Sequence, residues 1–175
     1  MKKALSIVFL GAVLLSAAAL NAQDVPLSIK LEGGVPQVIN CQSNEIPVLS
    51  WSFGGSVPTS TSGGTTGTTS GKATLSQLTI AKAFDGCSAG LFQALVRGAQ
   101  YTKVTLTQLK KDDKGLLNPF MSVVMTKAMI TSYQISGSSG DTAFESESFN
   151  FVTITIRNAE NGSSFCWNTA KQAPC

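Results

Sequence analysis

The sequence has 175 residues, a length that fits one domain, and only 13% of them are charged, about half the usual share. The formal net charge is +3, but Lys2 and Lys3 lie in a predicted leader, and without them eleven basic residues face ten acidic ones. This balance gives no electrostatic reason to expect nucleic acid or an anionic membrane as a partner. The lack of histidine excludes nucleophile–histidine triads and histidine-ligated metals, so we expect no enzyme and no cofactor.

Residues 1–22 are predicted to be a secretory signal peptide that is cleaved after Ala22. A basic start, Met1-Lys2-Lys3, is followed by an apolar run from Leu5 to Leu20 and then by polar residues. The alternative is a membrane anchor, but the run is shorter than the ~20 residues that a spanning helix needs. The mature chain, residues 23–175, is therefore expected to be one exported domain, periplasmic or extracellular, with no membrane attachment.

All four cysteines lie in the mature chain: Cys41, Cys87, Cys166 and Cys175. An even number in an exported chain favours disulfides over free buried thiols. Three pairings are possible, and the sequence does not choose between them. The short spacing of Cys166 and Cys175 favours that pair, with Cys41 bonded to Cys87. No CxxC pair is present, which together with the missing histidine argues against a zinc site.

Two strands are predicted before residue 54. Apolar and polar residues alternate from Val25 to Leu31, and Gly33-Gly34 ends that strand. The second runs from Glu45 to Phe53, where Pro47 indicates a sheet edge or a bulge. Three residues of the second strand share the face that we expect to be buried: Leu49, Trp51 and Phe53.

Residues 55–71 are almost entirely Gly, Ser, Thr and Pro. Such a composition buries too little apolar surface to offset the entropy of ordering, so we expect a mobile loop in an isolated subunit. Its end, Gly67 to Lys72, partly matches a phosphate-binding loop, but Thr66 and Ala73 break the pattern, which argues against nucleotide binding.

A strand and a helix are predicted in the middle of the chain. The strand covers Lys72 to Phe84 with one irregularity, and the helix covers Ala89 to Arg97, with Ser88 as its cap and Gly98 as its end. One helix face is apolar and is expected to pack in the core: Leu91, Phe92, Leu95 and Val96.

Two longer strands follow, separated by a charged turn. Thr102 to Leu109 is the first strand, and Lys110 to Gly115 is a solvated hairpin turn rather than an acid/base site. Asn118 to Ile135 is apolar on both faces, which predicts burial by a second sheet, a helix or a neighbouring subunit. The two faces are Phe120, Val124 and Ile130 on one side, and Met121, Val123, Met125 and Met129 on the other.

The last long strand is predicted from Ala143 to Asn158. The apolar side switches at Phe151-Val152, which indicates a bulge or a crossing between two environments. Glu145 and Glu147 share one face, and we interpret them as exposed solubilising charges rather than a catalytic pair. Asn161-Gly162-Ser163 fits a glycosylation sequon, but we favour a turn.

Several segments, in order, resemble the haemolysin-coregulated protein (Hcp) family, the tube subunits of bacterial type VI secretion. The segments are LSIKLE at 27–32, EIPVLSWSFG at 45–54 with the Gly-rich loop after it, Gly71-Lys72 and the strand through Phe84 with the helix after it, SFNFVTITI at 148–156, and FCWN at 165–168. Together they cover nearly all of residues 25–170.

This resemblance implies a mainly β fold, a β-barrel of two sheets with one short flanking helix. It also implies a structural, non-enzymatic subunit that self-associates into hexameric rings, which stack into a tube carrying secreted effector or peptide cargo. The signal peptide departs from the family, so we expect an exported variant. The loop glycines are candidates for contacts between subunits: Gly55, Gly63, Gly64, Gly67 and Gly71. The alternative is a monomeric secreted β domain that binds a peptide or glycan.

Overall fold

The computed structural model describes residues 26–34, 45–61 and 68–175, and this part of the chain is mainly β with one short helix. The predicted signal peptide and Cys41 lie outside the described residues. No helix within the described ranges is long and apolar enough to cross a membrane. The elements are β1 Leu27–Glu32, β2 Glu45–Pro47, β3 Ser50–Ser52, β4 Gly55–Ser56, β5 Thr59–Thr61, β6 Thr68–Ser70, β7 Thr74–Leu75, β8 Leu78–Ala83, α1 Ser88–Val96, β9 Gln100–Lys111, β10 Leu117–Ser136, β11 Phe144–Asn150, β12 Thr153–Asn158, β13 Ser164–Asn168 and β14 Ala173–Pro174.

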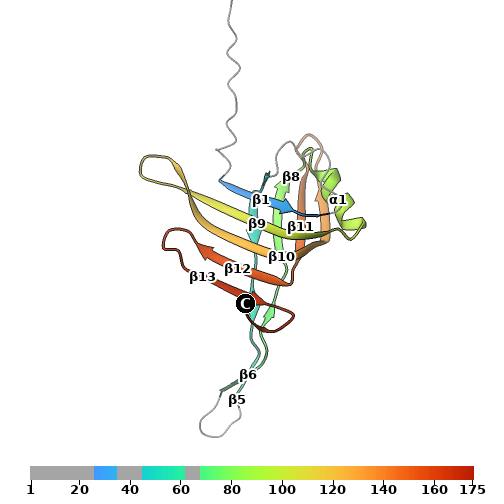
Figure 1. Ribbon diagram of the computed structural model, residues 1–175. Helices are drawn as coiled ribbons and strands as arrows, with labels where there is room; N and C mark the ends of the chain where they lie inside the picture. Colours follow the sequence, from blue (N-terminus) through green and yellow to red (C-terminus); the bar gives the residue numbers. More distant parts are fainter. Residues whose placement is uncertain (1–25, 35–44, 62–67) are drawn as a thin grey trace, which may run out of the picture.

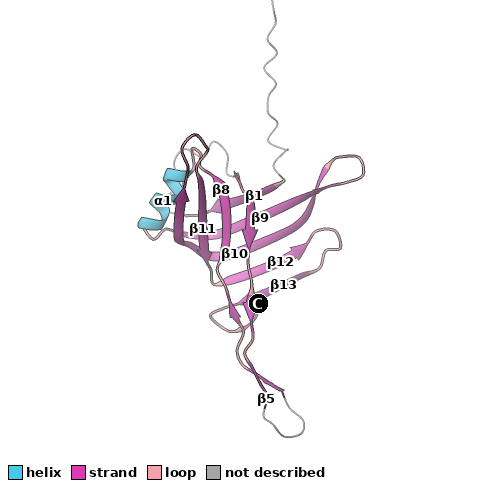
Figure 2. Cartoon of the chain, turned by 180° about the vertical axis from the view of Figure 1, so that it is seen from behind, coloured by secondary structure: helices cyan, strands magenta, loops and turns pink. Residues whose placement is uncertain are grey.

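Strand β10 belongs to two layers of strands that cross each other (Figures 1 and 2). Its first part pairs with β9 and β12, and its last part pairs with β11, which in turn pairs with β8. The change occurs near Lys127, whose φ of 49° is rare for a residue with a side chain and interrupts the alternation of faces. Ile130 therefore joins Val123 and Met125 in the core, which corrects its predicted place on the Phe120 and Val124 face.

The predicted strand from Glu45 to Phe53 is divided into two short strands, which lie at different edges of the large sheet. β2 pairs with β1, and β3 pairs with β8. Between them, the Val48 N–H donates to the Leu27 carbonyl and the Leu49 N–H donates to the Ala81 carbonyl. This break corrects the predicted face: Ile46 and Val48 are buried, Trp51 and Phe53 are half-buried, and Leu49 is 62% exposed. Among the described strands, pairing does not close into a barrel.

The Gly/Ser/Thr tract forms a two-stranded antiparallel arm that projects from the body (Figure 1). β4 pairs with β7, and β5 pairs with β6. The described part of the tract therefore has regular strand pairing, and the predicted mobility in an isolated subunit stays a prediction. Composition alone misses this pairing, because a hairpin satisfies its backbone groups across the ribbon without needing an apolar core.

Helix α1 lies against β10, but its start and its apolar face differ from the prediction. The cap position is Cys87, and Ser88 is the first helical residue, because its hydroxyl is used in a buried contact described below. Leu91 and Ala94 face the core, whereas Phe92 and Val96 are at least half exposed. Gly98 ends the helix as predicted, with a φ of +60° that glycine adopts easily.

The predicted strand Ala143–Asn158 is divided at Phe151 into β11 and β12, which pair with different parts of β10. The switch of faces predicted there is therefore a crossing between the two layers. The charged segment after β9 is a turn in which Asp112 accepts hydrogen bonds from the Lys114 and Leu116 N–H groups. Asn161-Gly162-Ser163 is also a turn, with Gly162 at φ +73°.

A disulfide joins Cys166 on β13 to Cys175, with the two Cα atoms 5.3 Å apart, as the spacing favoured. Cys87 is also disulfide-bonded, but the predicted partner, Cys41, lies outside the described residues. The Cys166–Cys175 bond closes a short loop and holds β14 against the outer edge of β13. It therefore covers a strand edge that would otherwise present unpaired backbone groups.

Replacing both Cys166 and Cys175 with serine is expected to lower the free energy of unfolding by about 2 to 3 kcal/mol, the chain-entropy value for so short a loop. Urea unfolding of the mature protein, with and without the substitutions, measures this difference. Serine at both positions keeps the size of the side chains, so a stability equal to that of the wild type would show that the bond contributes nothing to the fold.

Candidate subunit-contact site

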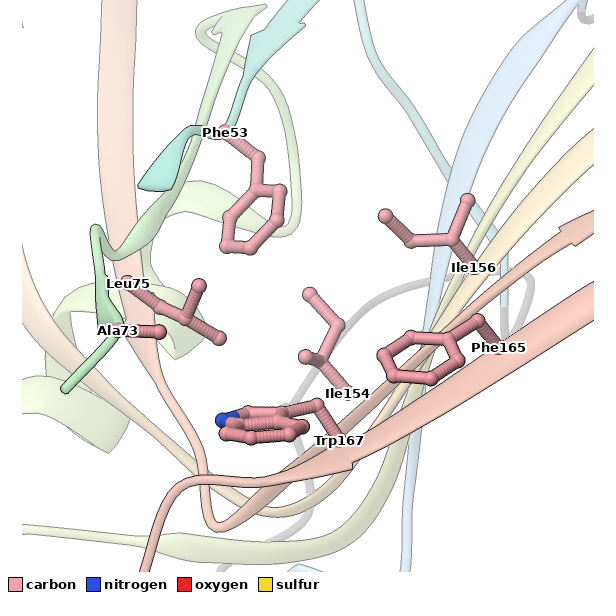
Figure 3. Close-up of a pocket in the computed structure, with 7 residues that line it drawn as sticks. All are labelled: Phe53, Ala73, Leu75, Ile154, Ile156, Phe165 and Trp167. Carbon is pink, nitrogen blue, oxygen red and sulfur yellow. The ribbon is translucent and has the colours of Figure 1, made fainter. Parts of the chain in front are cut away.

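An apolar pocket of about 300 Å³ lies at the base of the arm, where the arm meets β12 and β13 (Figure 3). One wall comes from the arm and the chain entering it, and the other wall from two paired strands. All the lining side chains are apolar: Phe53, Ala73, Leu75, Ile154, Ile156, Phe165 and Trp167. A surface hollow without any polar lining group is suited to an apolar side chain from a partner.

Strand pairing and aromatic contacts shape the wall formed by β12 and β13. Ile154 is opposite Trp167, and Ile156 is opposite Phe165, so the four side chains share one face of the ribbon. The Phe165 and Trp167 rings stack with centroids 6.3 Å apart. Because the Cys166–Cys175 disulfide lies between these two residues on the same strand, it also restrains this wall of the pocket.

Two of the residues that line the pocket are large apolar side chains that are exposed to solvent. Phe165 is 60% exposed and Ile156 is 42% exposed, although both sit beside the buried Ile154. In addition, the indole N–H of Trp167 is buried without a hydrogen-bond acceptor among the described residues. Because the hollow exposes no polar atom, this N–H does not face a partner there, and the exposed apolar pair is the feature that a bound partner would cover.

Two of the predicted subunit-contact glycines lie close to this pocket, near the root of the arm. Gly55 begins β4 and is opposite Leu75, and Gly71 follows β6, where its N–H donates to the Pro58 carbonyl. A Cβ atom at Gly71 would come within 2.8 Å of the Pro58 ring, so this position requires glycine. Gly63, Gly64 and Gly67 lie outside the described residues, and their predicted role stays a prediction.

Glu145 and Glu147, predicted to be exposed, are both buried, which corrects that interpretation. They lie on the same face of β11 as Phe149, which is fully buried. Lys82 is directly opposite Glu145 on β8 and is also fully buried, with its Nζ 2.6 Å from Glu145 Oε1. The period of two along β11, carried back from Phe149, is the signal in the sequence that would have identified this face.

This buried polar cluster is not an accessible site. Glu145 accepts hydrogen bonds from Lys82, from the Ser88 hydroxyl at 2.8 Å and from the Tyr133 hydroxyl at 2.6 Å. Burial, followed by the hydrogen bond to Glu145, raises the pKa of Tyr133 above its usual range. These contacts join β8, β10, β11 and the start of α1, so the carboxylate of Glu145 is used in holding the fold together.

Residues 31–157, well over half of the chain, match the family described as "Type VI secretion system effector, Hcp". The chain belongs to the Hcp family. Its role in that family is structural, as a type VI secretion tube protein. Among curated proteins, no match is found.

Solved structures of Hcp proteins share the fold. One, described as an Hcp protein, has a TM-score of 0.70 at 16% identity and covers 81% of this chain and 98% of its own. A second, described as a type six secretion system protein, has a TM-score of 0.69 at 23% identity over 85% and 98% of the two chains. The secreted protein Hcp3 from Pseudomonas aeruginosa has a TM-score of 0.66 at 18% identity over 82% and 97%. At such identities, the likeness concerns the Hcp fold alone.

Proposed function

We propose that this Hcp protein is an exported structural subunit that assembles into hexameric rings, which stack through the arm. The observation that carries the proposal is the open apolar pocket at the root of the arm, on a chain that belongs to a tube-forming family. Burying Phe165 and Ile156 against a neighbouring copy would remove apolar surface from water, at roughly 25 cal/mol per Å². Secreted effectors or peptides are the cargo class that the family suggests.

The barrel is part of the same proposal. Residues 45–52 hydrogen-bond to β1 at one end and to β8 at the other. We propose that this segment closes a barrel-like body in place of one continuous strand. Closure of this kind leaves β13 and the arm outside the body, where a second copy can reach both.

Export is proposed from the leader sequence and from the disulfide, since such bonds persist in oxidising compartments. The intact mass of protein recovered outside the cytoplasm tests this directly. A mass that corresponds to a chain starting at Gln23 is expected, and a mass that includes Met1 would contradict cleavage.

The test of assembly is multi-angle light scattering of the mature protein, with negative-stain microscopy of the same sample. Rings are expected for the wild type, and a strict monomer at high concentration would overturn the proposal.

Phe165→Ser is expected to abolish ring formation while the free energy of unfolding changes by no more than about 1 kcal/mol, because the side chain is already 60% exposed. Light scattering and urea unfolding of the same preparation separate the two effects. Val96→Ser is the matched control, since Val96 is 64% exposed on α1, away from the pocket, and is expected to leave rings intact. Equal loss of rings in both variants would contradict a role for the pocket.

A second candidate is a monomeric domain that captures an extended peptide or a glycan at the same pocket. The shape and lining of the pocket favour it, because a hollow of about 300 Å³ with apolar lining residues alone can take an apolar side chain or the apolar face of a sugar ring. Deleting residues 56–70 separates the two candidates. Loss of ring stacking in a folded protein supports the subunit, whereas loss of ligand binding in a protein that was always monomeric supports the binding domain.

A further inference from the structure

The carboxyl group of Glu147 is fully buried, and neither of its oxygens has a hydrogen-bond partner among the described residues. A buried carboxylate without a donor is costly, because it has lost its hydration and gained nothing in exchange. Glu147 lies two residues from Glu145 on the same face of β11, and it is opposite Tyr133 on β10 and Ile80 on β8. None of these neighbours directs a free donor at it.

The charges around Glu147 do not balance. Lys82 on β8 is the cation of the cluster, and its Nζ is already held by Glu145 at 2.6 Å, by Asp85 at 2.9 Å and by the Ala83 carbonyl at 2.8 Å. Three carboxyl groups therefore share one ammonium. The Tyr133 hydroxyl donates its hydrogen bond to Glu145 Oε2, and the helix adds only the neutral Ser88 hydroxyl, which also donates to Glu145.

We propose that Glu147 carries a proton in the folded protein and donates it in a hydrogen bond to Glu145, so that the two side chains form a carboxylic acid–carboxylate pair. This assignment gives one of the two Glu147 oxygens a partner and removes one negative charge from the buried part of the cluster. Burial, and then the charge of Glu145, raise the pKa of Glu147 to about 8. The proton is therefore retained at neutral pH.

The consequence is a proton-dependent attachment of helix α1. Ser88, the first residue of α1, is anchored on Glu145, and Asp85 receives the Cys87 N–H at the same helix end. When Glu147 ionises, two adjacent buried carboxylates repel each other, and Glu145 is displaced from its donors or water enters the cluster. Either change releases the first turn of α1.

The pH dependence has a definite sign. The folded pKa of Glu147, about 8, lies above its ordinary value of 4.5, so the folded chain holds a proton that the unfolded chain has released. The stability that depends on this proton is complete at pH values below the pKa of Glu147 in the unfolded chain. It is lost as the pH rises toward the folded pKa of about 8. Over that range, the unfolding equilibrium constant is expected to rise by up to tenfold per pH unit.

The experiment compares the wild type with Glu147→Gln, which keeps the shape and cannot ionise, and with Glu160→Gln, which alters an exposed ion pair. Urea unfolding of the mature protein from pH 5.5 to 7.5 gives the logarithm of the unfolding equilibrium constant as a function of pH. The slope of this plot is expected to be smaller in Glu147→Gln than in the other two proteins, by the equivalent of one proton. Equal slopes in all three proteins would overturn the proposal.

Infrared spectroscopy provides a readout that does not depend on unfolding. At pH 6.5 the wild type and Glu160→Gln are expected to show the carbonyl band of a neutral carboxylic acid, which Glu147→Gln lacks. Amide hydrogen exchange in residues 85–96, corrected for the intrinsic rate, is expected to accelerate above pH 8 in the wild type and not in Glu147→Gln. Absence of the acid band from the wild type would overturn the proposal even if a variant failed to fold.

Discussion

Replacing Lys82 with methionine is expected to lower the free energy of unfolding by about 3 to 5 kcal/mol, the range for a buried ion pair that loses one member. Methionine fills similar space, so the loss comes from charge and not from a cavity. Glu145 would stay buried without its cation, keeping the hydroxyl donors of Tyr133 and Ser88, and Asp85 would lose its 2.9 Å contact with the ammonium. Urea unfolding at pH 7 measures the change.

Lys110→Met is the matched control, because Lys110 pairs with Glu160 at 3.3 Å in an exposed position. Its expected cost is less than about 1 kcal/mol. A double variant, Lys82→Met with Glu145→Gln, is expected to recover part of the loss, since the amide still accepts from Tyr133 and Ser88 without a charge. If Lys82→Met proved no more damaging than Lys110→Met, the ion pair would contribute nothing beyond a surface contact.

Phe149→Ala is expected to cost about 3 to 5 kcal/mol, the range for truncating a phenylalanine in a closed core. Phe149 is fully buried on β11, opposite Leu78 on β8 and Ile130 on β10, at the point where the two layers meet. Removing the ring leaves a cavity that strands held by ladders on both sides cannot collapse to fill. Thermal and urea unfolding are the measurements.

Phe144→Ala supplies the comparison on the same strand. Phe144 lies five residues before Phe149 on β11. Because successive side chains alternate, it is on the opposite face, where it is 50% exposed. We expect it to cost less than about 1 kcal/mol. Similar costs for the two alanine substitutions would mean that β11 does not present Phe149 to a sealed core.

The sequence predicts strands and turns well wherever one pattern holds along a whole element. β1 and β9 form as predicted strands that pair in one continuous register, and Gly98 ends the helix with the positive φ that its position needs. The pattern fails where a strand changes partners. The segment with Val48 and Leu49 passes from β1 to β8, and Lys127 interrupts the alternation in β10, so faces assigned by counting are wrong beyond those points.

The buried cluster was missed for a different reason. Charged residues are rarely buried, so Glu145 and Glu147 are interpreted as surface charges when their strand is considered alone. The period of two counted back from Phe149 marks the face of Glu145 and Glu147, but the cation beside them comes from the register between β8 and β11, which places Lys82 opposite Glu145. Register is a tertiary property that one strand does not encode. The apolar pocket was missed likewise, because it requires residues near the arm to meet β12 and β13.

The arm is a direct continuation of two strands of the main sheet. Its two sides run directly out of β3 and β8, and these two strands are hydrogen-bonded to each other inside the sheet. A pull on the arm would therefore draw β3 and β8 in the same direction, and the load would fall on the β8–β11 ladder, which pairs six residues of each strand, and through β2 on the β1 edge. Hydrogen bonds of this ladder lie across the direction of the pull, so sliding would have to break several of them together, and the projection would transmit force into the domain.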